Sequence, residues 1–140
     1  MVLSVIRQDL FSMPSDFYLA HCISGDFALG AGIAKQFQEK FNMREKLKEF
    51  FPEGGRVGDS LMVGRVFNLV TKEKYWQKPT YSSLRNALLT MRYQCSALEV
   101  SKLAMPKIGC GLDRLDWGIV KDIIAETFEK EKTEIVICVI

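Results

Sequence analysis

Two glycine-rich segments constrain the fold of this chain more than any other feature. They are Gly30-Ala31-Gly32-Ile33-Ala34 and Ile108-Gly109-Cys110-Gly111-Leu112-Asp113. Each follows an apolar, strand-like run and leads toward a helix-like pattern, which is typical of the strand-to-helix turns of α/β proteins. Glycine allows close backbone approach, and the free N–H groups at a helix start attract anionic oxygens. Two such turns on one sheet therefore predict the two halves of one anion-binding cleft.

Neither turn matches the common nucleotide-binding motifs. Lys35 is only the third residue after Gly32, and no third glycine follows at the required distance, so the spacings GxxxxGK[ST] and GxGxxG are both absent. This disfavours an ordinary kinase or dehydrogenase and favours another nucleotide derivative that carries a diphosphate. The plainer alternative is that both segments are tight strand-to-helix turns, which need glycine whatever the ligand.

The rest of the chain alternates strand-like and helix-like patterns. Strands are expected over residues 2–6, 18–23, 61–63, 65–70, 103–105 and 135–140. Helices are expected over residues 33–41, 47–51, 79–95 and 116–128, the last with Asp116 as its N-cap. Because strands and helices alternate and the later strands are apolar on both faces, the expected fold class is α/β. The predicted architecture is a three-layer α/β/α sandwich with a mixed central sheet.

Length and charge bound the domain organisation and the partners. The chain has 140 residues, of which 48% are hydrophobic, and it contains no repeat or linker-like stretch, so one domain over residues 1–140 is expected. The net charge of +2 comes from interleaved acids and bases, which disfavours nucleic-acid binding. No apolar run approaches the roughly 20 residues of a membrane span, and no secretory signal pattern is seen. We expect no membrane association, an intracellular location in the cytoplasm or nucleus, and a monomer.

The cysteine and histidine content indicates no metal site. Cys22, Cys95, Cys110 and Cys138 form no CxxC pair, and the chain has a single histidine, His21. This is typical of reduced, mostly buried thiols in an intracellular protein, and it lacks the ligand spacing of a structural zinc site. His21 is expected to be packed and hydrogen-bonded. Cys110 is expected to be structural, because only His21 would be present to activate it.

Several short motifs follow one another in an order that resembles a known family. They are Asp9-Leu10-Phe11, Ala20-His21-Cys22-Ile23-Ser24, the turn from Gly30 to Ala34, Val70-Thr71-Lys72, Lys78-Pro79-Thr80-Tyr81, and the block from Met105 to Leu115. Together they resemble the macrodomains, within the branch of the terminal ADP-ribose protein glycohydrolase, over nearly the whole chain. The resemblance implies ADP-ribose and ADP-ribosylated proteins as partners, ADP-ribosyl hydrolysis as the activity, and no metal or organic cofactor.

The resemblance also implies which residues bind the nucleotide. The residues that it assigns to substrate binding are Asp9, Leu10, Ser24, Gly30, Ala31, Gly32, Ile33, Ala34, Gly109, Cys110, Gly111 and Leu112. Asp9 would accept a hydrogen bond from the adenine amino group, and the Ser24 hydroxyl would reach the distal ribose or a phosphate. From position alone, Asp9 caps a turn near Ser12, and Ser24 is an ordinary loop residue. Phe11 and Trp117 are candidates to stack on the adenine.

Lys72 and Asp113 are the catalytic candidates. The Lys72 side chain, at the end of an apolar strand, can project into the cleft, where a free amine is a nucleophile. The resemblance implies that this amine attacks the anomeric carbon of the distal ribose and displaces the protein carboxylate, leaving a covalent lysyl adduct. Asp113 would take the proton or act in general acid/base steps. From position alone, Lys72 is solvated, and Asp113 pairs with Arg114 or a helix start.

Several other functions fit the same sequence. A non-catalytic ADP-ribose-binding module needs Asp9 and the two turns but has no use for Lys72 and Asp113. Phosphatase action on ADP-ribose 1″-phosphate is an enzymatic alternative, and the same cleft could also deacylate O-acetyl-ADP-ribose. Docking of RNA or poly(ADP-ribose) on the lysine-rich rim would show an affinity that falls steeply with salt. Tyr75 and Trp76 would either shield the site or cover the core.

Overall fold

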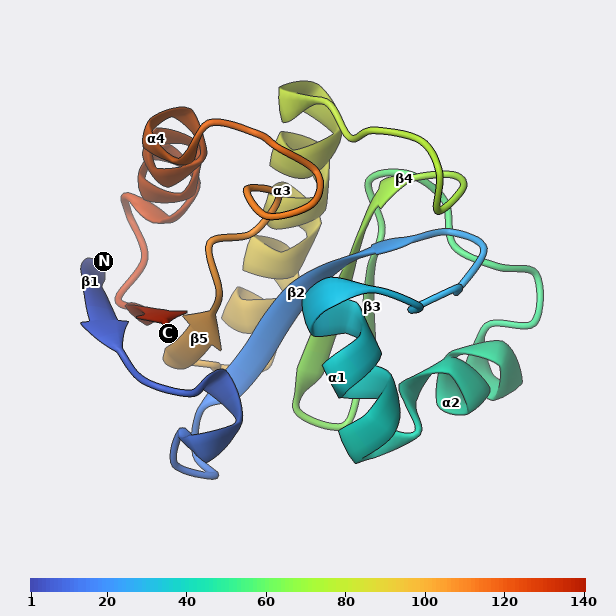
Figure 1. Cartoon of the computed structure of the whole chain (residues 1–140). Coiled ribbons are helices and arrows are strands. Elements are labelled where there is room, and N and C mark those ends of the chain that lie inside the picture. The colour runs from blue at the N-terminus through green and yellow to red at the C-terminus, as the bar shows by residue number, and fades with distance from the viewer.

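The computed structural model describes all residues 1–140 and shows one six-stranded sheet with helices on both faces (Figure 1). In chain order the elements are β1 (Val2–Arg7), the 3₁₀ helix η1 (Leu10–Ser12), β2 (Tyr18–Ser24), α1 (Gly32–Phe41), α2 (Met43–Phe50), β3 (Ser60–Val63), β4 (Val66–Lys72), α3 (Tyr81–Ala97), β5 (Lys102–Met105), α4 (Trp117–Phe128) and β6 (Glu134–Val139). None of the helices is long and apolar enough to cross a membrane.

The sheet is mixed, as the sequence predicts. Its strand order is β1-β6-β5-β2-β4-β3, and every neighbouring pair is parallel except β3 and β4, which are antiparallel. Strand β2 lies between β5 and β4. The carboxyl ends of these three parallel strands therefore meet at one edge of the sheet, which is where ligands bind in open α/β folds. One glycine-rich turn follows β2 and the other follows β5, so the topology places the two turns side by side.

Two hydrophobic cores, one on each face of the sheet, confirm the three-layer sandwich. Phe67 and Leu69 of β4 pack with α3 and α4 on one face, while Val70 of the same strand packs with Phe37 of α1 on the other. Figure 1 shows α1 and α2 on the opposite side of the sheet from α3 and α4. Helices α1 and α2 are separate because Asn42 between them has a left-handed backbone, with φ of 55°.

His21 is packed in the core, as expected. Its Nε2 lies 2.6 Å from Oδ1 of Asn68 on the adjacent strand, and its ring stacks on Phe37 with centroids 3.8 Å apart. Asn68 in turn donates from Nδ2 to the carbonyl oxygen of Leu61 at 3.0 Å. Burial lowers the pKa of His21 to about 4, against the smaller opposing effect of the bond to Asn68. The imidazole is therefore neutral at physiological pH and acts as a structural link between β2, β4 and α1.

Folding stability is expected to fall as the pH drops from about 6.5 to about 4. Because the folded-state pKa of His21 is depressed, the unfolded chain binds a proton more readily over this range. The contribution of neutral His21 to the free energy of unfolding is fully present above pH 6.5 and is lost as the pH falls to the folded-state pKa of about 4. The total loss is about 3 kcal/mol. Urea titrations at several pH values measure this slope. The His21→Gln variant, which removes the only histidine, should lose the slope between pH 6.5 and 4.5, and an equal slope in both proteins would contradict the assignment.

Candidate functional site

The loops after β2, β4 and β5 enclose a cavity of about 900 Å³. Its wall has three parts. The first is the end of β2 with the loop that follows it, residues 22–24 and 28–34. The second is Lys72 at the end of β4 with residues 75–78, and the third is residues 106–109 and 111–113 after β5. A second depression at the opposite end of the sheet, beside Cys95 and Thr133, is about half that volume. The large cavity unites the two glycine-rich turns with Lys72 and Asp113, in the arrangement that the sequence predicts.

Most of the residues predicted to bind substrate lie in this cavity wall. They are Ser24, Gly30, Ala31, Gly32, Ile33, Ala34, Gly109, Gly111 and Leu112. Asp9, Leu10 and Cys110 lie outside the wall, and their part in binding stays a prediction. The Asp9 carboxylate accepts a hydrogen bond from the Phe11 amide at 2.9 Å and so caps η1, while Leu10 is buried in the core. The Cys110 thiol donates to the carbonyl oxygen of Ile108 at 3.2 Å.

The first glycine-rich turn brings the N-terminus of α1 to the cavity. Helix α1 begins at Gly32, and its N-cap residue Ala31 has no side chain that can accept a hydrogen bond from the first turn. Gly32 has a φ of +58°, which L side chains adopt only with strain. The first-turn N–H groups of this ten-residue helix are thus free of side-chain caps beside the cavity. Such groups, together with the helix dipole, favour a bound anion.

The second glycine-rich turn depends on Gly109 in two ways. Gly109 has a φ of +71°, and a Cβ built there would lie 2.8 Å from Cδ1 of Leu115. The Leu115 amide donates to the carbonyl oxygen of Gly109 at 2.8 Å, which closes the turn. Gly111, two residues later, has open space around the position of a Cβ. The two glycines therefore have different roles, because only Gly109 is required by backbone conformation and packing.

Replacing Gly109 with alanine is expected to destabilise the fold by about 1–3 kcal/mol, because the added methyl group forces a strained backbone and displaces Leu115. Chemical denaturation of the purified variant measures this loss. The matched Gly111→Ala variant changes the same loop at a position with free space, so its stability should stay within about 0.5 kcal/mol of the parent. An equal loss of stability in the two variants would contradict the different roles given to Gly109 and Gly111.

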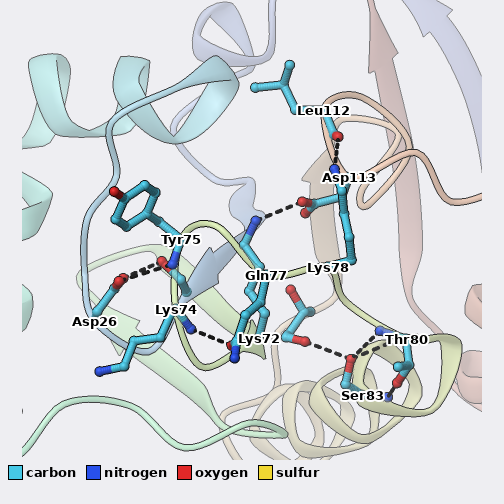
Figure 2. Close-up of polar contacts among 12 residues, drawn as sticks. Asp26, Lys72, Lys74, Tyr75, Gln77, Lys78, Thr80, Ser83, Leu112 and Asp113 are labelled. Carbon is cyan, nitrogen blue, oxygen red and sulfur yellow. Dashed lines mark hydrogen bonds and ion pairs between the residues drawn. The ribbon is translucent and has the colours of Figure 1, made fainter.

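Lys72 and Asp113 form an ion pair inside the cavity (Figure 2). The Nζ atom of Lys72 lies 2.8 Å from Oδ1 of Asp113, and the two side chains are only 15% and 17% exposed. The positional expectation that Asp113 pairs with Arg114 or caps a helix is wrong for this structure, since Asp116 caps α4. A lysine amine in contact with a carboxylate has an acceptor for its proton within hydrogen-bond distance. The pair can therefore supply a nucleophile and a base.

Cys22 is the only thiol in the cavity wall, and its protonation state makes it a poor nucleophile. Burial, followed by the negative charge of Asp113, raises the pKa of the Cys22 thiol to about 12. Because the thiolate rather than the thiol attacks, Cys22 is unreactive at neutral pH. The Ser24 hydroxyl donates a hydrogen bond to the Asp26 carboxylate at 2.5 Å. Lys72 is thus the strongest candidate for nucleophilic chemistry in the cavity.

Asp26 lies outside the cavity wall but positions two of its loops, and the sequence analysis missed it. Besides Ser24, its carboxylate accepts hydrogen bonds from the amide of Ala28 at 3.2 Å and from the amide of Tyr75 at 3.0 Å. Partial burial disfavours its charged form, but these hydrogen bonds hold the pKa of Asp26 below its ordinary value. Asp26 therefore joins the loop after β2 to the loop after β4 (Figure 2). The bond to Ala28, two residues on, is the local pattern that could have revealed it.

The four aromatic candidates fall into two groups, one beside the cavity and one outside its wall. Phe11 packs edge-on against Phe37, with centroids 4.8 Å apart, and neither Phe11 nor Trp117 lines the cavity. Their stacking on adenine stays a prediction. Tyr75 and Trp76 do not cover the core, since both rings are exposed and line the outer part of the cavity. Lys78 donates from Nζ to the carbonyl oxygen of Leu112 at 3.0 Å and so connects two walls of the cavity.

Comparisons with known proteins show which family this chain resembles. No family model matches the sequence. The chain is 42% identical over 128 residues to ADP-ribose glycohydrolase OARD1 of Bos taurus, covering 91% of this chain and 84% of that protein. It is 40% identical over 136 residues to ADP-ribose glycohydrolase OARD1 of Homo sapiens, covering 96% of this chain and 90% of that protein.

Solved structures show the same fold. The macrodomain of Thermus aquaticus DarG superposes with a TM-score of 0.86 at 23% identity, covering 99% of both chains. The macrodomain of Mycobacterium tuberculosis DarG gives a TM-score of 0.85 at 21% identity, covering 98% of this chain and 97% of that one. With the fold of these macrodomains and its sequence similarity to the two OARD1 proteins, this chain belongs to the macrodomain family, in the branch of ADP-ribose glycohydrolase OARD1.

Proposed function

We propose that this protein is an ADP-ribosyl hydrolase that removes ADP-ribose from acidic side chains of modified proteins. The observation that carries the proposal is the 2.8 Å contact between Lys72 Nζ and Asp113 Oδ1 in a cavity formed by two glycine-rich turns. The relatives at 40% and 42% identity are named ADP-ribose glycohydrolases, which supports the same reaction class. A module that only bound ADP-ribose would need the cavity but not this pair.

The cavity suits the nucleotide part of such a substrate. Its volume of about 900 Å³ lies in the range of cofactor-sized ligand sites. We assign the diphosphate to the free N–H groups at the start of α1 and to the turn around Gly109, because backbone N–H groups and a helix N-terminus bind phosphate oxygens. We assign the adenine amino group to Asp9. The distal ribose then lies toward Ser24 and Lys72.

The reaction begins with proton transfer from the Lys72 ammonium group to the Asp113 carboxylate, which leaves a neutral amine. The freed Nζ lone pair attacks C1″ of the distal ribose, the bond between C1″ and the ester oxygen breaks, and the protein carboxylate leaves with the electron pair. Water then attacks C1″ of the lysyl adduct, the C1″–Nζ bond breaks, and ADP-ribose is released. The proton that the attacking water loses restores the Lys72 ammonium group, and Asp113 gives up its own proton to solvent, which regenerates the starting ion pair. O-acetyl-ADP-ribose also carries an ester on its distal ribose, and we propose its deacylation as an accompanying activity.

Release of ADP-ribose from a glutamate-modified protein tests this function. The purified protein should liberate free ADP-ribose, measured by chromatography, and leave an unmodified carboxylate on the substrate. A substrate modified on arginine has an N-glycosidic linkage with a poorer leaving group and serves as the matched control, which should stay intact. Tight binding of ADP-ribose without release from either substrate would contradict hydrolysis and leave a binding module.

A further inference from the structure

Two large aromatic side chains stand exposed at the mouth of the cavity. Tyr75 is 65% exposed and Trp76 is 68% exposed, and both line the cavity from the loop that follows β4. An exposed aromatic residue by itself is ordinary, as Tyr93 on α3 shows with 72% exposure. The feature of interest is that two adjacent rings and Leu112, which is 66% exposed on the opposite wall, surround one opening. Apolar surface gathered in this way marks an interaction site.

The loop that carries the rings is held in place by hydrogen bonds. The Tyr75 amide donates to Asp26 at 3.0 Å, and the Lys74 amide donates to Oε1 of Gln77 at 2.8 Å. The Gln77 amide returns a bond to the carbonyl oxygen of Lys74 at 3.0 Å. Figure 2 shows these bonds between the end of β4 and the start of α3. The rings are therefore displayed on an ordered turn, which lowers the entropic cost of binding a partner.

The surroundings of the rings are positively charged. Lys78 and Lys107 are exposed residues of the cavity wall, and Lys74 is exposed in the loop that carries the rings. None of the three forms a salt bridge, and Glu73 is the exposed acid of that loop. Lys72 and Asp113 neutralise one another inside the cavity. The rim thus carries an excess of cations beside exposed aromatic surface. Such a surface complements an acidic polypeptide rather than a neutral or basic one.

We propose that residues 73–78 bind the polypeptide that carries the ADP-ribose, at an acidic segment next to the modified side chain. The inference rests on the proposed function, because it places the scissile ester at the Lys72 amine, and Lys72 directly precedes this loop. The departing carboxylate and its neighbours in the substrate protein then lie over Tyr75 and Trp76. Lys74 and Lys78 attract the flanking carboxylates, and the rings pack on the substrate chain.

Affinity measurements with two ligands separate this surface from the nucleotide cavity. The ligands are free ADP-ribose and an acidic peptide ADP-ribosylated on glutamate, both titrated against protein with the Lys72→Ala change so that the peptide stays intact. The modified peptide should bind about tenfold more tightly than free ADP-ribose. Adding Tyr75→Ala and Trp76→Ala should remove most of this gain while the Kd for free ADP-ribose stays within about twofold. These changes leave the backbone hydrogen bonds of the loop in place.

Tyr93→Ala is the matched control, because it removes an equally exposed ring from α3, away from the cavity wall. It should change neither affinity. Equal losses for both ligands in the Tyr75 and Trp76 variant would overturn the proposal and assign the rings to the nucleotide. Unchanged affinity for the modified peptide would overturn it as well. Because the readout is binding, this result is independent of whether the wild type hydrolyses the ester.

The charge of the peptide provides a second, separate readout. An ADP-ribosylated peptide with neutral flanking residues should lose part of the gain, and the Lys74→Glu variant should weaken only the acidic peptide. Raising the salt concentration should reduce the preference for the acidic peptide more than it reduces affinity for the neutral one. Equal affinity for acidic and neutral peptides at low salt would overturn the acidic specificity.

Discussion

Replacing Lys72 with alanine is expected to lower the release of ADP-ribose from a glutamate-modified protein by about 1000-fold or more, because it removes the attacking amine. The affinity for free ADP-ribose should change by only a few-fold, since the glycine-rich turns and the start of α1, to which we assign the diphosphate, remain in place. The loss should therefore appear in kcat rather than in KM. Single-turnover kinetics together with calorimetric titration of ADP-ribose measure the two quantities separately.

Two control variants distinguish loss of a nucleophile from loss of a charge. Lys72→Arg keeps a cation next to Asp113 but supplies no free amine at neutral pH, so it should be as inactive as the alanine variant. Lys102→Ala removes a different ion pair, also 2.8 Å long, between Lys102 and Asp16 at the surface, and should keep full activity. Normal turnover in Lys72→Ala would contradict the covalent mechanism. Activity in Lys72→Arg would assign to Lys72 an electrostatic role instead.

Replacing Asp113 with asparagine is expected to lower turnover by about 100-fold to 10,000-fold, the range for loss of a general acid/base. The amide keeps the size and hydrogen-bonding reach of the carboxylate but does not accept the proton of the Lys72 amine. The adduct that does form should accumulate, because the step that releases it also needs this base. Rapid quenching of the reaction at short times measures turnover and adduct together.

The control for Asp113 is Asp16→Asn, which changes the carboxylate of the surface pair with Lys102 and should leave turnover unaffected. A second readout separates catalysis from structure. If Asp113→Asn lowered affinity for ADP-ribose as strongly as it lowered turnover, with no adduct, then Asp113 would serve to shape the site. A variant with normal turnover would remove Asp113 from the mechanism altogether.

The layers of the fold could be predicted because their signals are local. Strand β4 is apolar along most of its length, and it lies inside the sheet, between β2 and β3, with both faces buried. The glycine-rich turns also mark local backbone requirements, as the positive φ values of Gly32 and Gly109 show. The hydrophobic periodicity of a sequence does not show that Lys72 and Asp113, 41 positions apart, come into contact. The Lys72–Asp113 pair was predicted from motifs that resemble a family, and the parallel strand order then accounts for it.

What the sequence did not reveal depends on tertiary contacts. Asp26 reads as one more polar loop residue until the structure shows its carboxylate between two loops, bound to the amides of Ala28 and Tyr75. Tyr75 and Trp76 are apolar residues that a pattern alone would place in the core as readily as at the surface. Their exposure follows from the turn in which Lys74 and Gln77 bond one another.

Intact-protein mass spectrometry during reaction with a glutamate-modified peptide tests the central claim most directly. The account predicts that Asp113→Asn gains the mass of one ADP-ribose less one water, that digestion places this mass on Lys72, and that Lys72→Ala never gains it. The wild type should carry the adduct only briefly and finish unmodified with free ADP-ribose in solution. Rapid release by the wild type with no adduct in any variant at any time would contradict the account, because water rather than the lysine would then attack the ribose.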